Sequence, residues 1–532
     1  MNFRPTHPDT LASRNNLATA YHAAGNLDRA IALFERNLAD REQVLGTTHP
    51  DTLASRNNLA TAYHAAGNLD RAIALFERNL TDREQVLGTT HPDTLASRNN
   101  LAYAYQAAGD LDRAITLFQQ NLTDQEQILG PTHPHTLTSR GNLATAYQDA
   151  GDLDQAIPLH EQNLTDQEQI LGPCHPDTLT SRGNLAGAYR DAGDLDRAIA
   201  LLKQNLTDQE QVLGPTHPDT LTSRNNLAGA YRDAGDLDRA IALHEQNLTD
   251  RERILGPRHP QTLVSRNNLA LAYRDAGNLD QAIALHEQNL TDQEQVLGPT
   301  HPHTLTSRNN LATAYRDAGN LDQAIPLFQQ NLTDQEQILG PTHPQTLTSR
   351  NNLASVYQDA GKLDQAIALF ERNLTDREQI LGPRHPDTLA SRNNLATAYR
   401  EAGNLDQTIA LFEQTFTDTE QIFGPRHPDT LISRNNLAFA YRDAGDLDRA
   451  IALHEQTLTD TEQIFGPRHP ATLISRGCLA DVYRAAGNLD QAITLYEQAL
   501  SDAVEVLGDQ HPTTLVIRKN LKQASRERDE TT

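Results

Sequence analysis

A His-Pro dipeptide recurs at a constant spacing along the whole chain and constrains its fold more than any other feature. It occurs thirteen times, and the 504 residues between His7-Pro8 and His511-Pro512 are twelve steps of 42 without insertion or deletion. A fixed period of this length is typical of solenoids, in which each unit buries its apolar face only against its neighbours. The register therefore predicts one continuous array of repeats rather than several globular domains.

The composition suits thin layers of small and aliphatic side chains. Only 37% of the residues are apolar and there is no Trp. The net charge of −25 disfavours nucleic acid and anionic membranes as partners, because phosphate contacts need clustered Lys and Arg. No apolar run is long enough to cross a bilayer, and the N-terminus lacks a signal peptide. Cys174 and Cys478 lie more than seven repeats apart, so a disulfide between them is not expected. We therefore expect a reducing compartment and a cytoplasmic location.

Each repeat predicts two helices. In the first repeat, the first helix is expected from Pro8 to about Ala24, because proline suits the first helical position. Either Thr6 or His7 is the expected cap. Gly25, which is Gly in every copy, is expected to end this helix in a left-handed conformation.

The second helix is predicted from Leu27 to Leu45, with Asn26 as its cap and Gly46 as its end. It is longer than the first helix, so we expect the first helices to line the concave side. Both helices carry an apolar stripe at the 3–4 spacing of one buried face. The stripe consists of Leu11, Leu17, Ala18 and Tyr21 on the first helix, and of Leu27, Ala30, Ile31, Phe34, Leu38 and Leu45 on the second.

These residues resemble a known repeat family. Leu17-Ala18, Tyr21, Gly25, Ala30 and Phe34 match the tetratricopeptide signature, and the linker at 129–134 resembles that of kinesin light chains and of bacterial multi-repeat signalling proteins. The resemblance implies an all-α, right-handed superhelical α-solenoid of tandem helix-turn-helix repeats. It also implies a ligand groove on the first helices and a role as a protein-binding scaffold, although such repeats serve many pathways.

The chain departs from the family at two positions. Arg14 stands where the family usually has an apolar residue, and Asn37 where it usually has a small one. Arg14 recurs in all thirteen copies, Asn37 in nine and Asp40 in all twelve. A partly buried arginine must be paired, so we expect a structural polar column along the array. In the first repeat the column consists of Arg14, Asn37 and Asp40, and in the second repeat it consists of Arg56, Asn79 and Asp82. Two alternatives remain, a pairing of each Asp with the arginine of the next repeat and an anion site.

The copies differ most on the face of the first helix opposite the apolar stripe. The Asn15 position is Asn in nine copies, and the His22 position becomes Arg in several repeats. Asn can bond an extended peptide backbone, and Arg can bind carboxylates. The predicted groove therefore binds an extended, acidic segment of a partner protein. Its expected residues are Asn225, Asn267, Asn309, Arg190, Arg232, Arg274 and Arg316. The alternative is a solvated surface, in which these arginines pair with adjacent acids such as Asp191 and Asp233.

No catalytic or metal-binding motif occurs. The sequence has no Gly-rich phosphate loop, no Cys-x-x-Cys and no nucleophile elbow. Four histidines replace Phe34, at a position that we expect to be half-buried, and they come from different repeats: His160, His244, His286 and His454. We therefore expect no enzymatic activity, no metal and no cofactor.

The ends of the array differ. We expect residues 1–6 to be the remnant of a linker, 7–510 to be twelve repeats, and 511–532 to be a capping helix from Pro512 to about Ala524 followed by a polar tail. The first helix would expose an apolar flank, which could support self-association. Two further functions stay open: a self-assembling structural array, and the sensor portion of a larger bacterial nucleotide-switch signalling protein.

Overall fold

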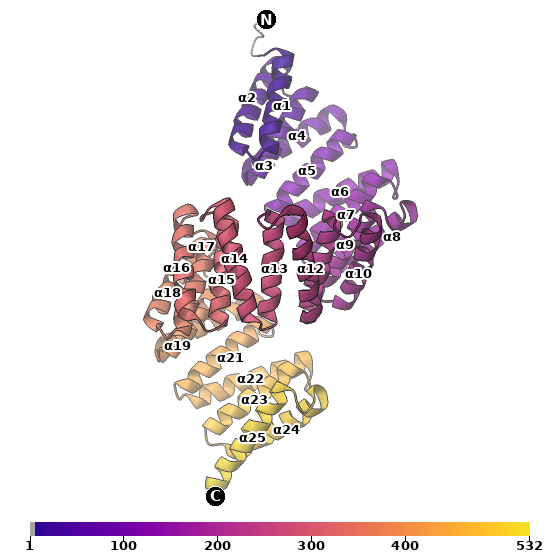
Figure 1. The fold of residues 1–532 in the computed structure, drawn as a ribbon. Coiled ribbons are helices and arrows are strands. Elements are labelled where there is room, and N and C mark those ends of the chain that lie inside the picture. The colour runs from indigo at the N-terminus through magenta and orange to yellow at the C-terminus, as the bar shows by residue number, and fades with distance from the viewer. Residues whose placement is uncertain (1–5, 532) are drawn as a thin grey trace. The chain divides into compact units, whose positions relative to one another are not determined.

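The computed structural model describes residues 6–531 as α-helices joined by short turns and linkers, without a strand in that range (Figure 1). The expected fold class, an all-α array of helix pairs, is thereby confirmed. Residues 1–5, which make up most of the expected linker remnant, lie outside the described part. The chain comprises two units, residues 1–276 and residues 277–532, and consecutive helices within each unit pack against one another.

The first helix of each repeat, called helix A, begins at the proline of the His-Pro dipeptide. In the first unit the A helices are α1 (Pro8–Ala23), α3 (Pro50–Ala65), α5 (Pro92–Ala107), α7 (Pro134–Asp149), α9 (Pro176–Asp191), α11 (Pro218–Asp233) and α13 (Pro260–Asp275). In the second unit they are α15 (Pro302–Asp317), α17 (Pro344–Asp359), α19 (Pro386–Glu401), α21 (Pro428–Asp443), α23 (Pro470–Ala485) and α25 (Pro512–Thr531).

The second helix of each repeat, called helix B, is two or three residues longer. In the first unit the B helices are α2 (Leu27–Leu45), α4 (Leu69–Leu87), α6 (Leu111–Leu129), α8 (Leu153–Ile170), α10 (Leu195–Val212) and α12 (Leu237–Leu255). In the second unit they are α14 (Leu279–Leu297), α16 (Leu321–Ile338), α18 (Leu363–Leu381), α20 (Leu405–Phe423), α22 (Leu447–Phe465) and α24 (Leu489–Leu507).

The linker histidine caps helix A. The backbone N–H of Asp9 donates to Nδ1 of His7 at 3.3 Å, and every later His-Pro repeats this bond. At the other end Gly25 has a φ of 74°, and the N–H of Asn26 donates to the carbonyl of Tyr21 at 2.9 Å. The left-handed glycine and this bond are parts of a Schellman motif, which satisfies the last carbonyls of the helix. The turn between the two helices is therefore fixed by the backbone.

Two expected details of the helix ends differ from the structure. Asn26 stands at the start of α2 but forms no capping bond through its side chain, whereas Asp110 at the start of α6 accepts from the N–H of Arg113 at 3.3 Å. Asp152 at the start of α8 forms no such bond, so an aspartate caps helix B in some repeats only. Helix α25 continues to Thr531 instead of ending near Ala524, since the polar side chains after Ala524 are compatible with one more exposed helical segment.

The core lies between the helix layers and is repeated rather than central. Ala60 of α3 and Ala72 of α4 are completely buried where the two helices cross, and Phe76 fills the space beside them. Leu59 is buried against the preceding repeat, while its counterpart Leu17 in α1 is half exposed. Each repeat therefore completes its core with side chains from its neighbour.

Candidate functional site

A buried arginine in each A helix links three segments of the chain. Arg56 of α3 is 0% exposed. Its Nη1 donates to Oδ2 of Asp82 in α4 at 2.6 Å, and its Nη2 donates to Oε1 of Glu42 in α2 at 3.1 Å and to the carbonyl of Thr47 at 3.1 Å. A guanidinium suits this task because its planar fork carries several fixed donors. Arg56 thus joins its own repeat to the preceding repeat and to the linker between them.

The same bonds recur at intervals of 42 residues. In the first repeat Arg14 donates to Asp40 at 2.5 Å. Later arginines pair with the aspartate 26 residues ahead, and most also pair with the glutamate 14 residues behind. The arginine–aspartate pairs are Arg98–Asp124, Arg140–Asp166, Arg182–Asp208, Arg224–Asp250, Arg308–Asp334, Arg350–Asp376, Arg392–Asp418, Arg434–Asp460 and Arg476–Asp502.

The structure therefore places the arginine and the aspartate of the polar column together within one repeat, not across the boundary. The contact across the boundary comes from Glu42 and its counterparts, which the sequence reasoning missed. The signal was present, because this position is Glu in eleven of the twelve copies.

Asn37, the third expected member of the column, points elsewhere. Its Nδ2 donates to Oγ of Ser55 in the next A helix at 3.3 Å, and Asn79 bonds Ser97 in the same way at 3.4 Å. Both asparagines are fully buried. The expected Arg14–Asn37–Asp40 cluster is thus two separate contacts, one within a repeat and one between repeats. Helix B presents the two side chains to different neighbours.

The predicted groove arginines lie on one row of the A helices, and the structure pairs them with acids. Nε of Arg190 donates to Asp233, Nε of Arg232 lies 3.6 Å from Asp275, and Nη2 of Arg274 lies 3.3 Å from Asp275. In the second unit, Arg316 donates to Asp359.

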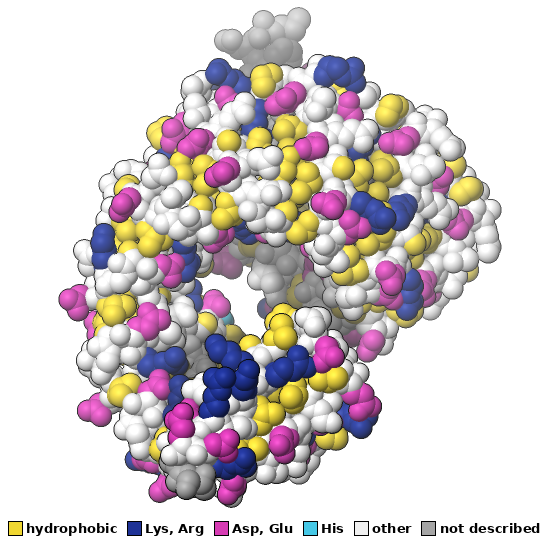
Figure 2. Space-filling view, turned by 60° about the horizontal axis from the view of Figure 1, so that its bottom comes forward, with side chains coloured by type: hydrophobic (Ala, Val, Ile, Leu, Met, Phe, Trp, Pro, Cys, Tyr) yellow, Lys and Arg dark blue, Asp and Glu magenta, His cyan; other side chains and the backbone are white. Residues whose placement is uncertain are grey.

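The partner is thus mostly the aspartate of the next A helix, 43 residues ahead. The third and fourth repeats carry glutamine here and keep the geometry, with Gln106 donating to Asp149 and Gln148 donating to Asp191, both at 2.5 Å. The row is therefore close to neutral. Over most of the face seen in Figure 2, basic and acidic side chains are likewise interspersed, and Lys and Arg gather only in one patch in the lower half of the view.

The predicted groove asparagines belong to a second row beside the arginines. Nδ2 of Asn268 donates to Oδ1 of Asn225 at 2.8 Å, and Asn352 donates to Asn309 at 2.9 Å. Asn267 occupies the corresponding position on α13 and is half-buried. We call these two rows, of asparagine and of arginine or glutamine, the A face. They bring together one asparagine and one arginine or glutamine on α5, α11 and α13 of the first unit and on α15, α17, α19 and α21 of the second; the asparagine position is Gly on α7, α9 and α23, and the other position is His on α1 and α3.

Tyrosine also connects successive repeats. The hydroxyl of Tyr63 donates to the carboxylate of Glu35 in the preceding repeat, and that of Tyr189 donates to Glu161. Burial and the glutamate raise the pKa of both phenols, so the hydroxyls stay protonated and keep donating at neutral pH.

The histidines that replace Phe34 are buried, not half-buried as expected. His160, His244 and His454 are at most 3% exposed, and burial lowers the pKa of each to about 4. Nearby Arg232 and Arg442 add to the lowering for His244 and His454, respectively. Nδ1 of His454 lies 3.2 Å from Oδ1 of Asn435. These rings are core residues of separate repeats.

Within residues 6–531, two kinds of feature do not occur, a metal-holding cluster and a membrane-spanning helix. No group of three or more His, Cys, Asp or Glu in this range is arranged to hold a metal ion. None of the helices described is both long and apolar enough to cross a membrane. Both cysteines are free thiols, Cys174 exposed and Cys478 half-buried.

Comparisons with known proteins agree with the repeat architecture. Twelve overlapping segments, from residues 9–81 to residues 471–531, match the family model described as tetratricopeptide repeat. A candidate kinesin light chain of Podosopora anserina with nearly identical TPR-like repeats is 36% identical, with 38% of this chain and 97% of that chain covered at a TM-score of 0.36. BtubC (BKLC) from P. vanneervenii is 21% identical, with 44% and 94% covered at a TM-score of 0.38. No curated protein matches the chain.

Tetratricopeptide repeats are generally protein-interaction scaffolds and typically non-enzymatic. The residues first noted in the sequence occupy the positions that such repeats require: the alanines at the helix crossing, the glycine in the turn and the aromatic side chain of helix B. The chain belongs to the tetratricopeptide repeat family.

Proposed function

We propose that the chain is a scaffold that binds an extended, acidic segment of a partner protein along the A face. The observation that carries this proposal is the presence of one asparagine and one arginine or glutamine on each of the A helices α11 and α13 of the first unit and α15, α17, α19 and α21 of the second. A segment that crosses successive repeats of this kind meets the same kinds of group at each step. Its backbone and its side chains can then be bound by different rows.

The asparagine row supplies groups for the backbone. The bond from Asn268 uses only Oδ1 of Asn225, so the NH2 group of Asn225 can donate to a peptide carbonyl. Side chains held by a neighbouring amide lose less freedom on binding, which favours affinity. The row therefore acts as a set of fixed donors.

The arginine row supplies groups for carboxylates. Arg232 and Arg274 are 30% and 27% exposed, and their contacts with Asp275 are 3.6 and 3.3 Å. Ion pairs at such a surface contribute about 0–1 kcal/mol, so a carboxylate of the partner can replace the aspartate at little cost. The overall charge of −25 repels an acidic partner at long range, so binding depends on these short-range contacts.

Selection of random peptides displayed on phage against the intact chain tests the proposal. We expect acidic peptides to be enriched on the wild-type chain and lost on the Arg232→Glu/Arg274→Glu variant. The matched control is Arg197→Glu/Arg239→Glu, which makes the same change of charge at exposed arginines of α10 and α12 outside the A face. If the same peptides are enriched on all three chains, this binding surface is wrong.

A further inference from the structure

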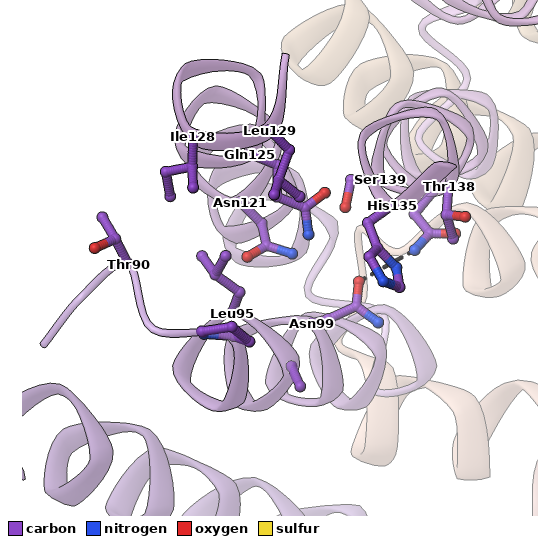
Figure 3. Close-up of a pocket in the computed structure, with 13 residues that line it drawn as sticks. Thr90, Leu95, Asn99, Asn121, Gln125, Ile128, Leu129, His135, Thr138 and Ser139 are labelled. Atoms are coloured by element: carbon purple, nitrogen blue, oxygen red, sulfur yellow. Dashed lines mark hydrogen bonds between the residues drawn. The ribbon is translucent and has the colours of Figure 1, made fainter. Parts of the chain in front are cut away.

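Two pockets of the same construction lie in successive repeats of the first unit. One, of 390 Å³, lies between α5, α6 and α7, and the next, of 480 Å³, lies between α7, α8 and α9. Asn121 and Gln125 of α6 line the first pocket, and Asn163 and Gln167 stand at the same positions 42 residues later. Figure 3 shows both amides of α6 facing the space that is bounded by α5 and α7.

These amides are buried and incompletely bonded. Asn121 and Gln125 are 1% and 8% exposed, and Asn163 and Gln167 are 2% and 6% exposed. Oδ1 of each asparagine and Oε1 of each glutamine have no hydrogen-bond partner. Buried polar groups in proteins are almost always bonded, so the glutamine oxygens at two equivalent places require an explanation. A ligand that enters the pocket would supply the missing bonds.

The glutamine position divides the repeats into groups. Where it is arginine, the guanidinium bonds the chain itself: Arg83 donates to the carbonyl of Asp93 at 2.6 Å, and Arg377 donates to that of Asp387 at 2.7 Å. Where it is threonine, as at Thr419, the hydroxyl donates to a carbonyl of its own helix at 3.0 Å. Where it is glutamine, Oε1 stays without a partner in every copy: Gln125, Gln167, Gln209, Gln293 and Gln335. The unbonded glutamine oxygens are therefore confined to the glutamine repeats, whereas Oδ1 of the asparagine is also unbonded in arginine repeats, as at Asn79 and Asn373.

The lining of the first pocket defines the chemistry of its ligand. It includes no Asp, Glu, Lys or Arg, and the second pocket has Asp177 where the first has His135, so neither pocket offers a carboxylate a Lys or Arg partner. Leu95, Ile128 and Leu129 provide apolar walls around the two amides. An amide can present either its oxygen or its NH2 group to a ligand, so the matching group both donates and accepts. A carboxamide on a short aliphatic stem, as in Asn or Gln, meets all three conditions.

We propose that these pockets bind the carboxamide side chains of an extended partner segment, one in each glutamine repeat. This inference rests on the proposed function and names the side chains that the segment places beside the A face. Asn142 of α7 donates to Asn99 of α5 at 3.1 Å, so these two A helices have the separation of packed helices, about 8–10 Å. A polyproline II segment rises about 9 Å per three-residue turn and presents every third side chain on one side. Asn or Gln at every third residue would therefore reach successive pockets.

Fluorescence anisotropy with labelled peptides of known sequence tests the inference on the full chain. The probes are (Gln-Pro-Pro)6, (Ala-Pro-Pro)6 and (Glu-Pro-Pro)6. The test variant is Gln125→Arg/Gln167→Arg, which copies Arg83 and fills both pockets. The control is Gln120→Arg/Gln162→Arg, which copies Arg78 at exposed positions of the same helices and changes the charge equally.

We expect the Gln peptide to bind at least tenfold more tightly than the Ala peptide. The pocket-filling variant should lose this advantage, and the control should keep it. Equal affinity for the Gln and Ala peptides, or unchanged binding by the pocket-filling variant, would overturn the inference. So would saturation of the pockets by free L-glutamine, because the ligand would then be a small amide.

The two proposals fail in different ways. If the peptides selected on phage bind through Arg232 and Arg274 but show no preference for Asn or Gln, only the pocket inference is wrong. If no extended peptide binds at all, the proposed function is wrong as well.

Discussion

The buried histidines predict a loss of stability in mild acid that depends on three side chains. His160 in α8, His244 in α12 and His454 in α22 occupy a core position that is Phe in other repeats, such as Phe76 and Phe118. Replacing the three histidines with Phe restores the residue that neighbouring repeats already accommodate. The variant should therefore fold, and its response to pH should differ from that of the wild-type chain.

The size of the effect follows from the pKa values. Burial lowers the pKa of each of these histidines from 6.5 to about 4. As the pH falls from 6.5 toward 4, the unfolded state binds protons that the folded state does not, so the free energy of unfolding decreases. At 1.36 kcal/mol per pKa unit the loss is roughly 3 kcal/mol per histidine below pH 4 and about 2 kcal/mol at pH 5. Above pH 6.5 the full stability is present.

Hydrogen exchange measured by mass spectrometry suits an array, because a repeat protein opens locally rather than all at once. Between pH 7.5 and pH 5, the free energy of local opening of α8, α12 and α22, obtained from their protection against exchange, should fall by about 2 kcal/mol more in the wild-type chain than in the triple Phe variant. A control variant, His135→Gln/His303→Gln, changes exposed histidines to the residue found at Gln261 and Gln345 and should behave as wild type. Parallel pH profiles for the wild-type chain and the triple variant would refute the reasoning.

Two further predictions concern single residues. Asp208→Ala should lower the free energy of unfolding of its repeat by roughly 3 kcal/mol, because the buried guanidinium of Arg182 loses its partner at 2.6 Å. The control Asp196→Ala changes an exposed aspartate and should have little effect. Equal denaturation curves for the two variants would contradict this role of the column. Iodoacetamide at pH 8 should modify exposed Cys174 within minutes and leave Cys478 intact in the folded chain. The reason is that burial raises the pKa of the Cys478 thiol to about 11, and the thiolate is the reactive form. If mass spectrometry finds both thiols modified at the same rate, this environment of Cys478 is wrong.

The sequence was sufficient for features that lie within one repeat. The proline after each His, the glycine at the turn and the 3–4 apolar spacing predicted the limits of α1 and α2 to within a residue. The pairing of Arg14 with Asp40 was predictable for the same reason, because antiparallel helices that turn near Gly25 bring these two positions close together. Local rules of helix geometry decide all of these features.

Features between repeats were less predictable. The period gives the order of the repeats but not the offset at which one helix lies against the next. The contact of Arg56 with Glu42, 14 residues back, and that of Arg190 with Asp233, 43 residues ahead, depend on this offset. Asn37 contacts Ser55 and not the arginine for the same reason. The unbonded oxygens of Gln125 and Gln167 become visible only once three helices are placed around a pocket.

The offsets of 14, 26 and 43 residues recur in repeat after repeat of both units. Unequal crossing-over that removes or adds a whole multiple of 42 residues would bring an arginine of the column to acceptors of the same kind, because the aspartate 26 residues ahead is present in all twelve copies and the glutamate 14 residues behind in eleven. Such a gene could lengthen or shorten without an intermediate in which a buried arginine lacks its carboxylate. An insertion of any other length would break the bonds at one junction, and selection against that single defect would keep the spacing uniform.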